Sequence, residues 1–192
     1  MPSPDRARFQ NTRDQREALR ELVLFTRSTI FSPEAAPLVV TAARKITQGC
    51  PARDDRCELE AIYKAVKHGT PAVKALSKGL RYVSDPVIVD WFQSGERTLK
   101  SCAKGACAGD CDEHAVLVAQ LCIAVGFEVG LRAWAPPKGS RDYGHIYACA
   151  AASKSHPSND PLEWLGMDTT VDSARVGWDP PAGRWITAVV TE

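Results

Sequence analysis

Hydrophobic residues recur at helical spacing in the first third of the chain. Asn11–Ile30 and Glu58–His68 each place apolar side chains on one face, and both are predicted helices. Between them, Ser32 followed by proline has the residues of a helix start and predicts a further helix that ends at Lys45. Glycine, proline and paired aspartates predict a loop at Gln48–Asp55.

The second half of the chain changes from helical to extended patterns. Its longest apolar stretch predicts a helix from Cys111 to about Val125. Leu80–Val83 is a short extended segment, and Gly95–Gly109 has no regular pattern. Four later segments, separated by loops rich in proline, glycine and serine, are predicted strands. They are Val129–Trp134, Gly144–Ala150, Glu163–Asp168 and Trp185–Val190. Helices followed by antiparallel strands predict an α+β protein.

The length of 192 residues suits one domain. We expect residues 1–12 to be disordered or loosely packed and residues 13–192 to form the domain, with a helical part (13–75) and a second part (76–192). The 24 Lys and Arg nearly balance the 23 Asp and Glu, so neither nucleic acid nor a membrane is expected as a partner. The first residues lack the apolar stretch of a secretory signal, and the expected location is the cytoplasm.

The chain has seven cysteines, an odd number, so they cannot all pair within it. Reduced thiols are the expectation for the cytoplasm, although Cys50 with Cys57, or Cys102 with Cys107, could form disulfides under oxidising conditions. Cys122 lies in an apolar stretch and is predicted to be a core residue, as is Cys149.

Cys111 is the candidate nucleophile. At a helix start its thiol lies beside unpaired backbone N–H groups and the positive end of the helix dipole, which both favour the thiolate. Asp110 is the predicted N-cap, and Gly109 would let a substrate approach the backbone closely. In the alternative interpretation, Cys102, Cys107 and Cys111 bind zinc with His114, although the spacing lacks a Cys-x2-Cys pair.

A nucleophilic cysteine needs a base, and His145 is the preferred candidate among four histidines. It lies on a predicted strand, a rigid element that can orient the ring. His114 is the alternative, but it shares one helical turn with Cys111 and leaves little room for a substrate. His68 ends a predicted helix and His156 lies in a polar loop.

The third group of such a site is an acid that orients the base. Asp168 ends a predicted strand and is followed by two threonines, Thr169 and Thr170. An aspartate in this position is also common as a turn residue. Asp172 is the competing candidate.

Together these motifs resemble the transglutaminase-like superfamily, in particular the bacterial and phage transglutaminase-like cysteine proteinases. The resemblance covers roughly residues 75–182. The matching segments are Leu80–Pro86, Phe92–Leu99, Gly109–Ala115, Gly144–Tyr147, Trp164–Thr170 and Gly177–Pro181.

The resemblance implies a papain/transglutaminase-like fold, with the nucleophile at the start of a central helix packed on an antiparallel sheet. It implies Cys111 as nucleophile, His145 as base, Asp168 as the orienting acid and Gln93 as an oxyanion donor, with Trp91 as the competitor for that last role. The implied chemistry is acyl transfer from an amide or peptide through a thioester, without cofactor or metal. A protein or peptide is the implied substrate, and phage structural proteins are further implied partners. The alternative function is a non-catalytic assembly or binding protein, in a phage particle for example.

Overall fold

The computed structural model describes residues 6–9, 15–31, 36–84, 90–137 and 143–191. It confirms a mixed α+β protein. Within the described residues there are five α-helices, two short 3-10 helices and eight strands. The helices are α1 (Gln15–Phe31), α2 (Pro37–Thr47), α3 (Asp55–Lys67), α4 (Gly95–Ala103) and α5 (Cys111–Ala124), with 3-10 turns at Lys74–Leu76 and Pro161–Glu163.

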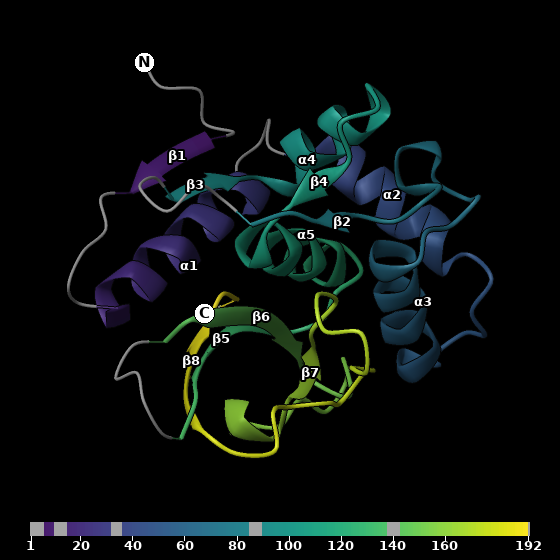
Figure 1. Cartoon of the computed structure of the whole chain (residues 1–192). Helices are drawn as coiled ribbons and strands as arrows, with labels where there is room; N and C mark the ends of the chain where they lie inside the picture. Colours follow the sequence, from purple (N-terminus) through teal and green to yellow (C-terminus); the bar gives the residue numbers. More distant parts are fainter. Residues whose placement is uncertain (1–5, 10–14, 32–35, 85–89, 138–142, 192) are drawn as a thin grey trace.

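The principal sheet is antiparallel and has the strand order β7-β6-β5-β8. Figure 1 shows it curving beneath α5. Its strands are β5 (Val129–Ala135), β6 (His145–Ala150), β7 (Leu165–Met167) and β8 (Arg184–Val189). All four predicted strands are confirmed, although the third is shorter than expected because Pro161–Glu163 forms a 3-10 turn.

Two small strand pairs lie apart from this sheet. β1 (Arg6–Phe9) pairs antiparallel with β3 (Asp90–Gln93), and β2 (Arg81–Tyr82) pairs in parallel with β4 (Ala108–Gly109). Of the N-terminal segment expected to be disordered or loosely packed, residues 1–5 and 10–12 lie outside the described part, and the expectation stays a prediction.

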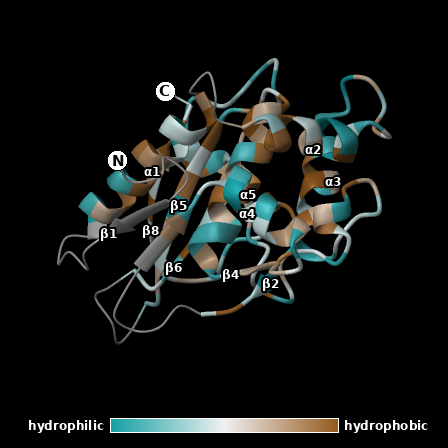
Figure 2. Cartoon of the chain, turned by 90° about the horizontal axis from the view of Figure 1, so that it is seen from above, coloured by the Kyte–Doolittle hydropathy of each residue, from teal (hydrophilic) through white to brown (hydrophobic). Residues whose placement is uncertain are grey.

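Helix α5 is the centre of the domain. Every residue from Glu113 to Cys122 is buried, so this helix is enclosed on all sides rather than amphipathic. It packs over the sheet, with α1 on one side and α2 and α3 on the other (Figure 1). Figure 2 shows hydrophobic stretches on neighbouring elements such as α3 and β5, with hydrophilic residues on several outer loops. None of the described helices is both long and apolar enough to cross a membrane.

Buried Gln120 joins α5 to two other helices. Its Oε1 accepts a hydrogen bond from the Gly95 N–H at 2.8 Å, and its Nε2 donates to Thr29 Oγ1 and the Thr26 carbonyl oxygen. A Cβ at position 95 would lie only 2.7 Å from Gln120 Oε1, so glycine is required for this close approach. These bonds satisfy a polar group that would otherwise be costly to bury.

Helix α4 was not predicted, because residues 95–109 show no helical pattern. It begins at a serine N-cap, where Ser94 Oγ accepts from the Arg97 N–H. Its buried Glu96 accepts from the N–H groups of Leu38 and Val39 at 2.8 and 3.4 Å, and so caps the start of α2. Helix α2 begins at Pro37 rather than near the predicted Ser32 start, which lies outside the described residues.

Two disulfides are present, contrary to the expectation of reduced thiols. Cys50–Cys57 links the loop before α3 to its first turn, and Cys102–Cys107 links the end of α4 to the residue before β4. The free cysteines are Cys111, Cys122 and Cys149. Burial of Cys122 and Cys149 confirms that they are core residues.

Candidate functional site

Local hydrogen bonds determine where α5 begins. The Asp110 carboxylate accepts from the Asp112 N–H at 2.9 Å, and the Asp110 N–H donates to Glu113 Oε2 at 3.0 Å. This capping box satisfies backbone groups at both positions and confirms Asp110 as the N-cap. The expected approach of a substrate to the Gly109 backbone stays a prediction, but a Cβ on Gly109 would lie 2.6 Å from the Glu113 Cβ. The small size of Gly109 makes room for Glu113.

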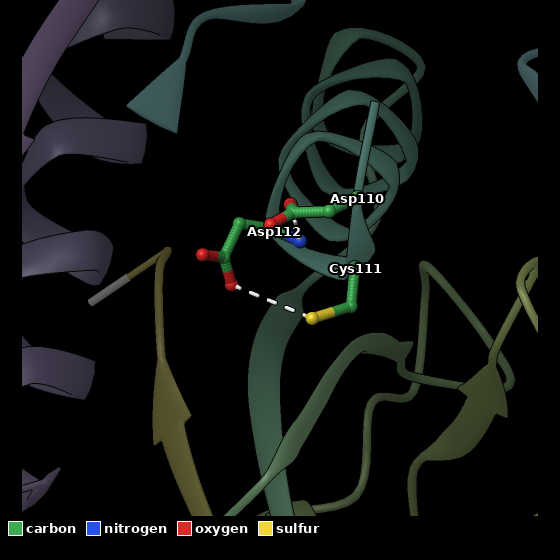
Figure 3. A group of neighbouring side chains, drawn as sticks. All are labelled: Asp110, Cys111 and Asp112. Atoms are coloured by element: carbon green, nitrogen blue, oxygen red, sulfur yellow. Dashed lines mark hydrogen bonds between the residues drawn. The ribbon is translucent and has the colours of Figure 1, made fainter. Parts of the chain in front are cut away.

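Cys111 is the first residue of α5 and is only partly exposed. Its thiol points toward Asp112, with 3.9 Å between Sγ and Oδ1 (Figure 3). Burial raises the pKa of Cys111, and the charges of Asp112 and Asp110 raise it further, while the backbone N–H of Ile146 and its own N–H act in the opposite direction. The lowered pKa expected from the helix dipole is therefore wrong for this arrangement, because desolvation and two carboxylates outweigh it.

The predicted base and acid are in contact. His145 Nε2 lies 2.7 Å from Asp168 Oδ2. His145 is the first residue of β6, and Asp168 directly follows the last residue of β7. The ring of His145 also stacks on Tyr147. Asp172, the competing acid, is exposed and accepts a bond from Lys67 only through its backbone carbonyl.

Thr170 holds the other oxygen of the Asp168 carboxylate. Its N–H and its hydroxyl both donate to Asp168 Oδ1, at 2.9 and 2.7 Å. Burial opposes ionisation of Asp168, but the hydrogen bonds from His145 and Thr170 outweigh it, and the pKa of Asp168 lies below its usual value. The carboxylate is thus fixed in orientation, and the threonine after the acid was the sequence signal for this turn.

Two residues of α3 that sequence reasoning missed anchor the Asp168 loop. The hydroxyl of Tyr63 lies 3.0 Å from the Asp168 carbonyl oxygen and 2.5 Å from that of Ala174. Lys67 Nζ contacts the carbonyl oxygens of Val171, Asp172 and Ala174. No local pattern identifies these residues, because their partners lie more than 100 positions away in the chain.

The thiol of Cys111 lies near the backbone of the residue that follows His145. The Ile146 N–H that favours the Cys111 thiolate belongs to the residue directly after His145. Because His145 Nε2 is engaged by Asp168, Nδ1 is the ring nitrogen that remains for a thiol proton. The start of α5 and the start of β6 therefore approach each other at the candidate site.

The alternative base, His114, is buried behind Cys111 and contacts a different partner. Its Nδ1 lies 2.8 Å from Thr169 Oγ1, and its Nε2 makes no hydrogen bond of good geometry. Burial lowers the pKa of His114 to about 4, and nearby His145 lowers it as well, whereas Asp168 and the Arg81 backbone act in the opposite direction. His114 is consequently neutral at neutral pH. The other histidines are placed as predicted, with His68 at the α3 C-cap and His156 in an exposed loop.

Gln93 ends β3 and lines a polar cavity of about 860 Å³ together with Tyr82, His114 and Thr169. Among the described residues, its side chain makes no hydrogen bond with Cys111. The competing Trp91 belongs to β3, but its side chain lies outside the described part. An oxyanion role for Gln93 remains a prediction.

The zinc interpretation loses two of its ligands, because Cys102 and Cys107 are bonded to each other. Asp110, Cys111 and Asp112 have ligand atoms within 4.8 Å of one another. One Asp110 oxygen is already used by the helix cap. Such a cluster at a helix start is explained by capping and needs no metal.

Comparison with known proteins adds no family assignment, since no protein-family model matches this chain and no curated protein matches its sequence.

Proposed function

We propose that this protein catalyses cysteine-dependent acyl transfer on amide or peptide bonds. The observation that carries the proposal is the 2.7 Å contact between His145 Nε2 and buried Asp168, which leaves Nδ1 for the thiol of Cys111. A nucleophile at a helix start, an imidazole on a strand and an orienting carboxylate are the groups that this chemistry needs. They also agree with the resemblance to transglutaminase-like cysteine proteinases.

In the proposed reaction, His145 takes the proton of the Cys111 thiol while Sγ attacks the amide carbonyl carbon. The C–N bond then breaks, the amine leaves with the proton from His145, and an acyl thioester remains on Cys111. His145 takes a proton from water as the water oxygen attacks the thioester carbonyl carbon. The C–S bond then breaks, a carboxylic acid leaves, and His145 returns the proton to Sγ. Hydrolysis makes the protein a peptidase or amidase, and an amine in place of water makes it a transglutaminase.

Because the pKa of Cys111 is raised, the proposed reaction needs His145 as a general base. A thiol that rests protonated needs a base to remove its proton when the substrate is bound, and such general-base catalysis contributes about 10²–10⁴-fold in rate. The oxyanion would be stabilised by the Cys111 backbone N–H at the start of α5, with Gln93 as the proposed side-chain donor.

The same raised pKa favours a second candidate function. A thiol that stays protonated suits a non-catalytic binding or assembly protein that keeps this fold, for instance in a phage particle.

A cytoplasmic location also stays a prediction. The two disulfides are more typical of oxidising compartments, so they give that location no support.

Alkylation with iodoacetamide across pH 5–9, followed by mass mapping, tests the proposal. We expect Cys111 to react faster than buried Cys122 and Cys149, and His145→Ala to slow it by about tenfold or more near neutral pH. His156→Ala, in an exposed loop, is the matched control. Equal rates at all three cysteines, or an unchanged rate in His145→Ala, would favour the non-catalytic function.

A further inference from the structure

A second cavity, of about 620 Å³, adjoins His145. Three aromatic side chains line it, those of Tyr82, Trp134 and Trp178. Apart from His145, no acidic or basic side chain lines it among the described residues. Its volume is in the range of sites that bind small ligands or single side chains, and such sites are mostly apolar.

The walls of this cavity are held by hydrogen bonds and an ion pair. Trp134 Nε1 donates to the Ala182 carbonyl oxygen at 2.9 Å, which joins two of the lining residues. Asp179, the residue after Trp178, pairs with buried Arg132 at 2.6 Å and accepts from the Tyr147 hydroxyl at 2.7 Å. The aromatic groups are therefore placed before any ligand arrives.

Among the described residues, charged side chains line the other cavity of the site and, His145 apart, not this one. The polar cavity that contains Gln93 shares Tyr82 and Thr170 with it, but includes the cationic side chains of Lys78 and Arg81. Tyr82 and Thr170 thus form the boundary between an apolar and a polar cavity.

The thiol lies near this boundary as well. Tyr82 pairs in β2 with Gly109 of β4, two residues before Cys111, and its ring centroid lies 6.4 Å from that of His114 on the first turn of α5. One wall of the apolar cavity is His145, whose neighbour Ile146 faces Cys111 through its N–H. A group seated in the cavity would therefore lie beside a carbonyl presented to the thiol.

We propose that this apolar cavity binds an aromatic or large aliphatic side chain of the substrate, next to the carbonyl that Cys111 attacks. This inference rests on the proposed acyl-transfer function. An apolar side chain fits this cavity best. Among the described lining residues there is no carboxylate to pair with a basic substrate group, and only a protonated His145 could pair with an acidic one. Burying apolar surface there stabilises the complex.

Peptidyl chloromethyl ketones that differ only in the side chain beside the ketone test the inference. The panel carries glycine, leucine, phenylalanine, aspartate or lysine, and the rate of Cys111 alkylation is measured. We expect phenylalanine and leucine to react about tenfold or more faster than aspartate and lysine, the range that one apolar contact supplies. Equal rates across the panel would overturn the inference, and faster reaction of lysine would indicate an aromatic cage for cations instead.

Substitutions distinguish an effect on substrate selectivity, which the cavity would determine, from an effect on the reactivity of Cys111. Trp178→Ala should reduce the ratio of the phenylalanine rate to the glycine rate, and Leu162→Ala, which removes an exposed apolar side chain outside the cavity, should leave both that ratio and the rate with iodoacetamide unchanged. Val171→Asp places a carboxylate in the cavity wall and should shift the preference toward lysine. A phenylalanine preference that persists in both cavity variants would overturn the inference. If iodoacetamide itself shows no His145-dependent reaction, the proposed function fails; if it does and the panel shows no selectivity, only this inference fails.

Discussion

The hydroxyl of Tyr63, on α3, lies 3.0 Å from the backbone carbonyl oxygen of Asp168, a residue 105 positions later in the chain. This contact connects the N-terminal helices to the acid of the candidate site. Burial raises the pKa of Tyr63 to about 12, so the hydroxyl keeps its proton and can donate it throughout the neutral range. The helical part of the chain therefore contributes directly to the geometry at Asp168.

Tyr63→Phe should weaken the Asp168 loop without removing a charged group. The carbonyl oxygens of Asp168 and Ala174 lose the single hydroxyl proton that they share, and a buried unsatisfied acceptor costs about 1–3 kcal/mol. We expect a lower free energy of unfolding in urea and slower alkylation of Cys111. Unchanged alkylation with reduced stability would show that the contact serves the fold alone.

Asp168→Asn should slow the reaction of Cys111 more than Asp172→Asn does. The amide can no longer stabilise a positive charge on His145, whereas Asp172 is exposed and lies outside the pair. We expect a decrease of about tenfold or more in the alkylation rate at neutral pH for Asp168→Asn, consistent with the contribution of an oriented base. A similar decrease in both variants would contradict the assignment of the acid.

His114 should make the protein less stable in weak acid. Its pKa is lowered from 6.5 to about 4 in the folded state, so between these values the unfolded chain binds a proton that the folded chain does not. Stability that is present above pH 6.5 is therefore lost as the pH falls toward 4, by about 3 kcal/mol from this group.

Urea unfolding at pH 7, 6, 5 and 4 measures this effect. His114→Gln should show a flatter pH dependence than the wild type, while the exposed His156→Gln should follow the wild type. Parallel curves for the wild type and His114→Gln would contradict the prediction.

Counting thiols checks the disulfides and the exposure of Cys111 together. The three free cysteines and two disulfides predict three reactive thiols in unfolded, unreduced protein and seven after reduction. In the folded protein Cys111 should react first, because Cys122 and Cys149 are buried. Seven reactive thiols before reduction would show that the disulfides do not form in the purified protein.

Glu96→Ala should destabilise the protein through helix α2. It leaves the N–H groups of Leu38 and Val39 without their carboxylate cap, which is worth about 1–2 kcal/mol. Lys100→Ala removes the exposed partner of the same carboxylate and should change stability by less than about 1 kcal/mol. Thermal unfolding of the two variants measures the difference, and equal effects would argue against the capping role.

The sequence alone determined the elements whose signals are local. The start of α5 follows from Asp110 and Glu113, which cap it within one turn, and the four strands of the main sheet follow from alternation and turn residues. The choice of His145 over His114 also rested on a local argument, its place on a strand. Capping motifs and hydrophobic periodicity involve residues only a few positions apart, so they can be recognised in the sequence itself.

Tertiary structure decided the remainder. Helix α4 was missed because its buried Glu96 and Gly95 are satisfied by α2 and α5, far away in the chain. The raised pKa of Cys111 could not be predicted either, since the dipole of α5 is a local property whereas desolvation depends on everything packed around the thiol. Burial and long-range hydrogen bonds exist only once distant segments are in contact, and these interactions determine the chemistry available to the candidate site.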